Sequence, residues 1–452
     1  MDVRRRIVLF GGQGSRSLFS PASLSVIEED VATSPAVSIL LSKCHVAFLE
    51  EISNLSEEEK RILGLDLHQF GHARSLLSVE GEDQEHAVLQ ATTLCLHQLL
   101  HYLGEAERHS TTFDVYFNNI LETTGFCAGL VPAAVVASSR TIGQYITFGV
   151  EAFRLAFWIG YRTLVRSLTF SGKQSLDATW SLIISGLDQA KVEDTISGVH
   201  AHSASQTLHI SGLSYPNVIS VSGPPHDLAI LKNLLGPQTT FAHVHAWYHG
   251  GDQLEEVVSQ IEKDIDDRDI HFPSASDILR PLRSTLDASM FHAGSPADRL
   301  DIWVIRHLLV HCVHWDAVFQ GILHVAYQTL QDDRDAFVEI DSFGPSSQFL
   351  LAGAKSHSDH PRLQVQDLSS FISSGERSDK GVGQEGIAIV GMGLNLPKGK
   401  GPEKLWQTLS NGLSAIQEIP ESRFNLSEHY TTDEPSKARS MHAKHGAFLD
   451  DI

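Results

Sequence analysis

One cysteine stands between two glycines in the stretch TTGFCAGLVPAAVVASS, residues 123–139. Gly125 and Gly129, two residues before and after it, permit a sharp strand-to-helix turn that projects the middle side chain from a strained backbone. A helix start favours the thiolate form of a cysteine, whose ordinary pKa is about 8.5, and the backbone N–H of Ala128 would face a developing oxyanion. Cys127 is therefore a candidate nucleophile. A buried structural thiol is the alternative for this residue type.

A general base for such a nucleophile has three candidates in the stretch HVHAWYHGG: His243, His245 and His249. Glycines follow His249 and predict a loop in which its imidazole faces a cleft, so we prefer His249 as the base, with His245 as the fallback. The H-x-H-x3-H spacing also raises the question of zinc. No fourth Cys, Asp or Glu ligand accompanies it at a recognisable spacing, and we predict no metal.

The stretch GGQGSR, residues 11–16, follows an apolar run and is the candidate for a phosphate-binding loop. It lacks the third glycine of G-x-G-x-x-G and the GK[ST] of a P-loop, and GMGLNL at residues 391–396 lacks that glycine too. We therefore predict no bound cofactor. The first stretch is either a plain tight turn or a second oxyanion donor, in which the backbone N–H of Gln13 joins that of Ala128.

Short β-branched runs that alternate with longer amphipathic stretches predict an α/β domain around these residues. Residues 4–10 read as a buried strand and 87–103 as a long helix. Residues 113–125 are expected to supply the strand that delivers Cys127, with a helix beneath it at 128–139.

The same patterns suggest where the chain divides. Within a first domain of residues 1–353, the order strand, helix, strand, strand, helix at about 178–240 predicts a small inserted subdomain of ferredoxin-like type. Residues 354–385 are rich in Ser, Asp, Lys and Gly and predict a linker. A new strand begins near Gly386 and opens a second region, 386–452.

The composition excludes several classes of protein. With 42% apolar and 20% charged residues the chain is typical of a globular protein, and no apolar run approaches a membrane helix. A formal charge of −21 argues against nucleic acid or an anionic membrane as partner. The four cysteines form no CxxC pair, so we expect no disulfide framework and a cytoplasmic, reducing location.

Together these features resemble the acyltransferase domains of fatty-acid and polyketide synthases. The resemblance rests on a strand leading into GQGS, the elbow around Cys127, an insert that runs into V-S-G at 221–223, an H-A-x-x-H segment at 245–249, and DSFGP at 341–345. Because GxCxG replaces GHSxG, the chain most resembles the starter-unit acyl-carrier-protein transacylase (SAT) domains of fungal non-reducing polyketide synthases. The tail, from IAIVGMG to KHGAFLDD, resembles the start of a thiolase-like ketosynthase.

This resemblance implies an α/β-hydrolase-like large subdomain with a parallel sheet, joined to the ferredoxin-like insert. It also implies transfer of an acyl starter from acyl-CoA, or from the carrier protein of a fatty acid synthase or highly reducing polyketide synthase, through an acyl-Cys thioester. The acceptor would be the phosphopantetheine of an acyl carrier protein. A thioesterase or cysteine hydrolase, and a docking module without chemistry, are the alternatives.

The resemblance further implies that Gly125, Gly129, Ile159 and Trp247 lie against the substrate. Malonyl-selective relatives carry an arginine one helix after the nucleophile, where it pairs with the substrate's free carboxylate. In RLAFWIGYR that position falls on Ile159, which predicts a neutral acyl group. Arg162 is close enough in sequence that a shift of the alignment would reverse this expectation.

Overall fold

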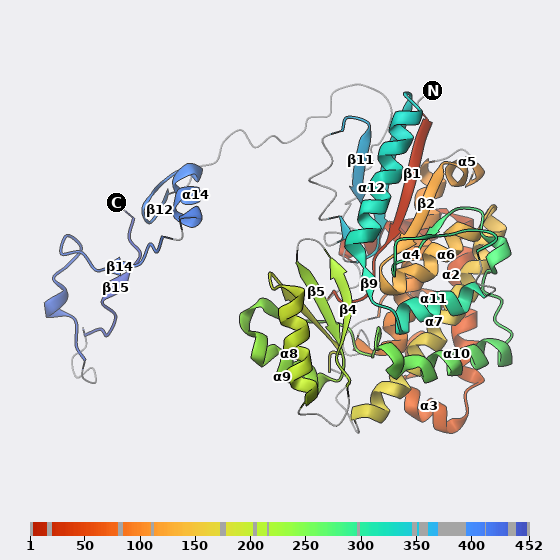
Figure 1. Ribbon diagram of the computed structural model, residues 1–452, viewed down its shortest axis with the longest axis horizontal. Helices are drawn as coiled ribbons and strands as arrows, with labels where there is room; N and C mark the ends of the chain where they lie inside the picture. The colour runs from red at the N-terminus through yellow and green to blue at the C-terminus, as the bar shows by residue number, and fades with distance from the viewer. Residues whose placement is uncertain are drawn as a thin grey trace. The chain divides into compact units, whose positions relative to one another are not determined.

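The protein is described from a computed structural model (Figure 1). The described residues are 3–15, 20–79, 85–109, 113–171, 178–201, 206–214, 217–295, 299–345, 350–351, 360–368, 395–411, 413–432 and 440–449. The chain divides into two compact units, Met1–Gly375 and Glu376–Ile452.

A six-stranded sheet organises the first unit. In spatial order its strands are β11 (Leu363–Asp367), β10 (Ala336–Phe343), β1 (Val3–Phe10), β2 (Ile120–Gly125), β7 (Leu282–Arg283) and β8 (Met290–Phe291). The strands from β11 to β7 are parallel, and only β8 is antiparallel to its neighbour. This confirms the predicted α/β class with a parallel core.

The two faces of this sheet bury separate cores, and β1 contributes to both. Val8 and Phe10 belong to one apolar cluster, while the alternate residues Ile7 and Leu9 belong to the other. Because side chains alternate along a strand, a run that is apolar at every position can be buried on both faces.

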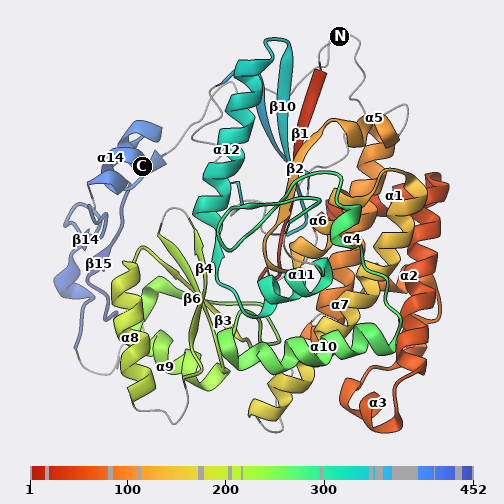
Figure 2. The same cartoon turned by 45° about the vertical axis from the view of Figure 1, so that its right-hand side comes forward.

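Helices supply the remaining sides of these cores (Figure 2). The face of Val8 and Phe10 is covered by α1 (Pro21–Thr33), α2 (Pro35–Ser53), α4 (Ala87–His109), α6 (Leu130–Ser138) and α7 (Ile142–Ser171). The other face is covered by α12 (Trp315–Asp332). Other helices of the unit are α3 (Glu57–Leu63), α5 (Phe113–Asn118), α10 (Glu255–Asp267) and α11 (Leu300–Leu309).

A second sheet belongs to the inserted subdomain. Its elements in chain order are β3 (Ser181–Ser185), α8 (Gln189–Ala201), β4 (His209–Ser214), β5 (Val218–Ser222), α9 (Pro225–Leu235) and β6 (Thr239–Ala242). The spatial order β6-β3-β5-β4 is the ferredoxin-like arrangement that the sequence predicts. A short fifth strand, β9 (Val313–His314), adds in parallel to β4 and ties the insert to the chain between α11 and α12.

Two local predictions are wrong. Residues 113–118 form helix α5 rather than the start of the strand, which begins only at Ile120. Leu363–Asp367, inside the predicted linker, forms β11 on the edge of the large sheet, because its apolar residues at alternate positions bury Leu363 against the sheet. The remaining domain boundaries stay predictions.

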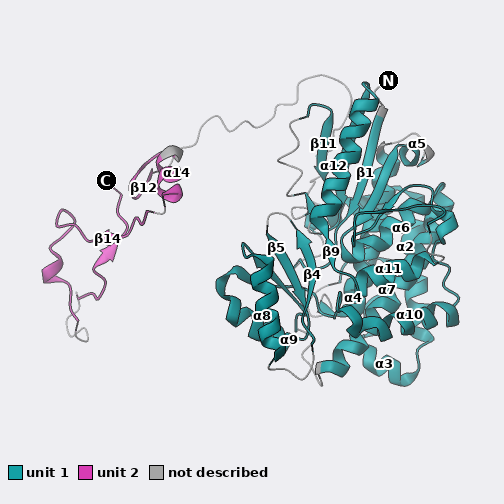
Figure 3. Ribbon diagram, viewed as in Figure 1, with its two compact units in different colours: residues 1–375 teal, residues 376–452 magenta. Residues whose placement is uncertain are grey.

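The second unit has few regular elements (Figure 3). They are β12 (Asn395–Leu396), β13 (Gly399–Lys400), α14 (Pro402–Ser410), β14 (Gln417–Glu418) and β15 (His445–Gly446). Trp406 and Leu409 of α14 are 70% and 62% exposed, so this helix buries little of its apolar side. The strand predicted from Gly386 lies outside the described residues.

Within the described part of the chain, no single helix has the length and apolarity to cross a membrane, although the bent pair α1–α2 passes that test when its two helices are joined.

Candidate active site

The turn around Cys127 joins β2 to a short 3-10 helix, η4 (Cys127–Gly129), which leads directly into α6. Cys127 has φ 50°, a left-handed conformation that is strained for a residue with a side chain. A Cβ on Gly125 would lie 2.0 Å from the Gly129 carbonyl carbon, and one on Gly129 would lie 2.4 Å from Phe10 O. Both glycines are therefore required by close backbone approach, and the turn is the sharp strand-to-helix turn that the sequence predicts.

The Cys127 thiol is buried, and burial decides its charge. Exclusion of water raises its pKa to about 12, while a hydrogen bond from the Ala128 backbone N–H acts in the opposite direction. The helix start thus exerts the predicted effect, but the expected thiolate is not the resting form. Cys127 rests as a neutral thiol and needs a base to become a nucleophile.

The loop after β1 lies directly against this thiol. A Cβ on Gly12 would lie 2.6 Å from the Phe126 backbone oxygen and 3.1 Å from the Cys127 Cβ, and the first of these contacts is too short for any residue but glycine. The next residue, Gln13, is 7% exposed, and neither amide atom of its side chain has a hydrogen-bond partner. Burying two polar atoms without hydrogen-bond partners costs free energy. Such unpartnered groups are typical of sites that bind a ligand.

His249 is held by hydrogen bonds from two directions. Its Nδ1 lies 2.7 Å from the His311 carbonyl oxygen, and its backbone N–H donates to Leu308 O at 3.1 Å. Ser222 Oγ, at the end of β5, donates to the His249 carbonyl at 2.8 Å. Because a carbonyl only accepts, Nδ1 carries the proton and Nε2 is left as the acceptor. Nε2 is buried and has no hydrogen-bond partner.

The electrostatic environment of His249 has two opposing parts. Its pKa is lowered to about 4, mainly by burial and to a smaller extent by repulsion from the His311 ring, while the hydrogen bond to the His311 carbonyl acts in the opposite direction. The carbonyls of Leu308 and His311, at the carboxyl end of α11, favour the protonated ring, since the last turn of a helix attracts positive charge. His249 is therefore a neutral imidazole whose cationic form would have partners in place.

These groups come together on facing segments. The Gly14 carbonyl accepts a hydrogen bond from the His243 backbone N–H, so the loop after β1 borders the segment of candidate histidines. The 3-10 helix of Cys127 contacts α11, whose end holds His249. Cys127 Sγ and His249 Nε2 are not hydrogen-bonded to each other. Catalytic hydrogen bonds in unliganded sites are often long and tighten when substrate binds.

His245 and Trp247 take positions different from that of His249. His245 is 7% exposed, and its backbone N–H faces Gln90 Oε1. Trp247 is fully buried, stacked on Trp180 at 5.7 Å and edge-on to Phe170 at 5.0 Å. These contacts account for Trp247 as part of the apolar core.

Ile159 lies in α7 and is 1% exposed. One turn further on, the Thr163 hydroxyl donates back to the Ile159 carbonyl. Arg162 points elsewhere: its Nε and Nη2 each donate to Asp264 at 2.6 Å in a bidentate pair. Arg162 is thus already paired with Asp264, and the role of Ile159 in acyl selection stays a prediction.

Sequence reasoning missed two contributors to this site. Tyr248 is 4% exposed, and its hydroxyl lies near the side chains of Thr163 and Gln13 although outside hydrogen-bond geometry; burial raises its pKa to about 12. An aromatic residue directly before a candidate base was the available signal. His311 was missed because it contributes its backbone carbonyl, which accepts the hydrogen bond from His249 Nδ1. Every residue has such a carbonyl, so the residue type gives no indication of this role.

No group of three His, Cys, Asp or Glu side chains in the described ranges is arranged to hold a metal ion. The four cysteines are unpaired.

Comparison with protein families identifies the chain. Residues 8–249 match the model of the family described as "Starter unit:ACP transacylase in aflatoxin biosynthesis". The chain belongs to this family of acyltransferases. Residues 384–452 match the N-terminal domain of β-ketoacyl synthases, so a partial ketosynthase region follows the SAT region.

Relatives of this SAT chain are fungal polyketide synthases. It is 31% identical over 466 aligned residues to an orsellinic acid synthase of Armillaria ostoyae, and 28% identical over 462 to one of Beauveria bassiana. Each alignment covers 98% of this chain and 20% of the relative. The chain therefore spans about a fifth of the length of these relatives.

Solved structures show the same fold at low identity. The malonyl-CoA:acyl-carrier-protein transacylase of Streptococcus pneumoniae superposes with a TM-score of 0.52 at 12% identity, covering 81% of this chain and 97% of that one. A transacylase in complex with its type II polyketide synthase carrier protein has a TM-score of 0.52 at 13% identity, with 80% and 94% covered.

Proposed function

We propose that this chain primes a polyketide synthase by moving a neutral acyl group from one thioester to another through Cys127. The observation that carries the proposal is the setting of His249: its Nδ1–H is fixed on the His311 carbonyl, so that Nε2 is a buried, unpartnered acceptor on the segment facing the cysteine turn. Fixing one ring nitrogen to orient the other is how a histidine base is prepared.

In the first half-reaction, His249 Nε2 removes the Cys127 thiol proton as the sulfur attacks the carbonyl carbon of an acyl thioester. The new C–S bond forms a tetrahedral oxyanion, which the backbone N–H groups of Gln13 and Ala128 would stabilise. Collapse breaks the bond to the donor sulfur, and that thiolate takes the proton from His249. The result is an acyl-Cys thioester and a free donor thiol.

In the second half-reaction, the phosphopantetheine thiol of an acyl carrier protein loses its proton to His249 and attacks the acyl-Cys127 carbonyl. Cys127 leaves and recovers the proton. Both halves exchange one thioester for another and are nearly balanced in energy, so positioning and charge stabilisation supply the catalysis. The donor is either acyl-CoA or the carrier protein of a fatty acid synthase or highly reducing polyketide synthase. No cofactor takes part.

The neutral acyl group follows from the surroundings of α7. Ile159 offers no charge, and Arg162 is occupied by Asp264. A free carboxylate buried at Ile159 would lose its hydration without gaining a partner, which costs several kcal/mol on the scale of buried unpaired charges. Malonyl groups are therefore disfavoured, and acetyl and longer unsubstituted chains are not.

Incubation with labelled hexanoyl-CoA followed by peptide mass spectrometry tests this function. We expect label on the Cys127 peptide, no label in Cys127→Ala, and full labelling in Cys312→Ala, which removes a half-buried cysteine as a matched control. His249→Ala should lose transfer to the carrier protein. If label appears undiminished in Cys127→Ala, the proposal is wrong.

Two other functions give different results in the same experiment. A thioesterase on this cysteine turn would release free hexanoate at a rate that added carrier protein does not change. A docking module without chemistry would bind carrier protein but leave Cys127 unlabelled.

A further inference from the structure

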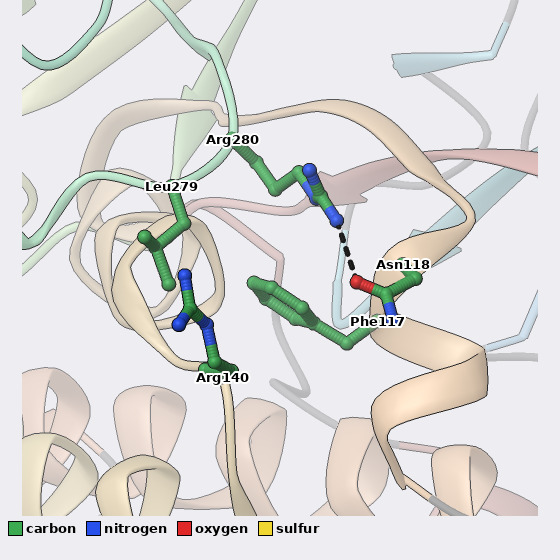
Figure 4. Close-up of a pocket in the computed structure, with 5 residues that line it drawn as sticks. All are labelled: Phe117, Asn118, Arg140, Leu279 and Arg280. Carbon is green, nitrogen blue, oxygen red and sulfur yellow. Dashed lines mark hydrogen bonds between the residues drawn. The ribbon is translucent and has the colours of Figure 1, made fainter.

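A second polar cavity lies away from Cys127. It has a volume of about 370 Å³ and is lined by Phe117, Asn118, Arg140, Leu279 and Arg280 (Figure 4). These residues come from three segments: the end of α5, the residue pair after α6, and the approach to β7. In Figure 4 the Arg280 side chain passes over the Phe117 ring toward Asn118, and the Arg140 guanidinium lies on the other side of this ring, next to Leu279.

The cavity is built on backbone hydrogen bonds. The N–H groups of Leu279 and Arg280 both donate to the Ala137 carbonyl, at 2.9 and 3.1 Å, near the end of α6. Arg280 Nη2 donates to Asn118 Oδ1 at 2.9 Å, and its guanidinium lies 5.1 Å from the centre of the Phe117 ring. The lining is thus held in position without a ligand.

The positive charge of this cavity is not compensated by the side chains that the structure describes. Neither Arg140 nor Arg280 forms an ion pair with a described carboxylate, and Arg280 Nε is buried without a hydrogen-bond partner. Several buried or half-buried arginines elsewhere have carboxylate partners, among them Arg6, Arg154, Arg162 and Arg283, whereas the half-buried Arg5, Arg268 and Arg362 form no ion pair with a described carboxylate.

Arg280 also lies near other positive charges. The pKa of Arg280 is lowered by burial first and then by repulsion from Arg140 and Arg5. Arg280 thus lies near two like charges although the formal charge of the chain is −21. An anion in the cavity would relieve this repulsion and supply a partner for the Nε–H.

The cavity is distinct from the acyl site. Asn118 lies just before β2 and Cys127 just after it, so the length of this six-residue strand, about 20 Å, separates them. The thiol is at the carboxyl end of the parallel strands, and the arginines are at the amino end.

We propose that this cavity binds a phosphate group. Two guanidinium groups match a doubly charged tetrahedral oxyanion better than a single carboxylate, because each presents a planar fork of donors. The Phe117 ring is occupied by Arg280 and by Phe113, which stacks on it at 6.2 Å with an interplanar angle of 13°. The ring is therefore not free to stack on a base, and recognition falls on the phosphate itself, either free or as a small phosphate monoester.

Thermal unfolding of the full chain in phosphate and in chloride, at matched ionic strength, tests the site. We expect inorganic phosphate to raise Tm, since a ligand that binds only the folded state stabilises it. Arg280→Gln and Arg140→Gln should each weaken the apparent affinity by roughly tenfold or more. Arg334→Gln, an exposed arginine on the turn before β10, is the matched control and should leave the shift unchanged.

A second expectation separates binding from general salt effects. Without phosphate, Arg140→Gln should raise Tm slightly, because it removes repulsion from Arg280. An equal Tm shift in all variants, or no shift with either inorganic phosphate or glycerol phosphate, overturns the proposal. A shift with glycerol phosphate alone identifies a monoester as the ligand. The readout is independent of acyl transfer, so its failure leaves the function of Cys127 untouched.

Discussion

Cys127 and His249 have pKa values displaced in opposite directions by the same cause. Burial raises the pKa of the Cys127 thiol to about 12 and lowers the pKa of the His249 imidazole to about 4, so both groups are neutral near pH 7. This difference in pKa disfavours a preformed thiolate–imidazolium pair, so in the proposed reaction the proton would move only as the sulfur attacks. In the proposed reaction, the backbone N–H groups of Gln13 and Ala128 would then face charge that exists mainly in the transition state.

Alkylation of Cys127 measures this resting state. With a pKa near 12, the residue has on the order of a thousandfold less thiolate at pH 7 than an unperturbed cysteine, so its reaction with iodoacetamide should be slow and should accelerate with rising pH. Peptide mass spectrometry over a pH series gives the rate, and Cys127→Ser identifies the peptide. Fast alkylation that is independent of pH above about 6 would contradict a neutral thiol.

Ile159→Arg tests what selects the acyl group. Placing a guanidinium at this buried position of α7 should decrease acylation by hexanoyl-CoA and increase acylation by malonyl-CoA, because a carboxylate then has a bidentate partner. The ratio of the two acylation rates is the measurement. Ile159→Met, of similar volume and no charge, is the control and should keep the wild-type ratio. Equal loss for both substrates would indicate a packing defect instead.

At the scale of elements, backbone carbonyls at the carboxyl end of α11 fix the position of the candidate base, His249. The carbonyls of Leu308 and Leu309 in the last turn of α11 accept from the backbone N–H groups of His249 and Gly250. The carbonyl of His311, two residues beyond the helix, accepts from His249 Nδ1. Helix ends leave such carbonyls without intrahelical partners, so they are available for this purpose. The residues that follow form β9 of the inserted sheet, so the carboxyl end of α11 is connected to the small subdomain.

His307 is positioned to fix the carboxyl end of α11. It is 3% exposed; its Nδ1 lies 2.8 Å from Trp303 O, its Nε2 3.1 Å from Ser284 Oγ, and its ring meets that of His311 edge-on. We expect His307→Phe to lower kcat for transfer by roughly tenfold to a hundredfold with KM unchanged, since a misplaced base slows chemistry rather than binding.

Rescue distinguishes positioning from loss of packing. His307→Gln retains a polar group that can reach Ser284 and should recover part of kcat, and Ser284→Ala should reproduce part of the loss. His292→Phe, at an exposed histidine, should have no effect. A rise in KM alone, or full activity in His307→Phe, would show that His307 does not act through His249.

Local signals decided which elements could be predicted. The cysteine turn and the ferredoxin-like order were readable because glycines and alternating apolar runs mark them directly. The helix at Phe113–Asn118 could not be predicted, because its aromatic and β-branched residues also favour a strand. Only tertiary packing decides between helix and strand for this segment. The edge strand β11 was hidden in a polar stretch because an edge strand needs few apolar residues.

The whole molecule carries several buried groups whose ordinary charge is suppressed. Four buried histidines have pKa values lowered by burial, to about 3 at His97 and about 4 at His101, His249 and His307. Asp341 is the opposite case: burial raises its pKa to about 7, despite its hydrogen bond from Arg6. Such shifts make the free energy of unfolding depend on pH.

Acidification from pH 7 to pH 5 should therefore destabilise the first unit. A histidine with a folded pKa near 4 and an unfolded pKa near 6.5 contributes stability that is complete above pH 6.5 and is lost as the pH falls toward 4. Each histidine loses at most about 2 kcal/mol at pH 5. Asp341 gains stability over the same range because its folded form binds a proton earlier than its unfolded form, and the pKa values of Asp30, Glu122 and Asp264 are raised in the same direction. Among the described residues, these four carboxyls oppose seven imidazoles, because the pKa values of His200, His209 and His311 are lowered as well. Urea denaturation at the two pH values gives the difference, and His97→Leu should reduce it if the protein folds. Equal or greater stability at pH 5 would mean that the buried histidines are protonated in the folded state, in conflict with the neutral base of the proposed acyl transfer.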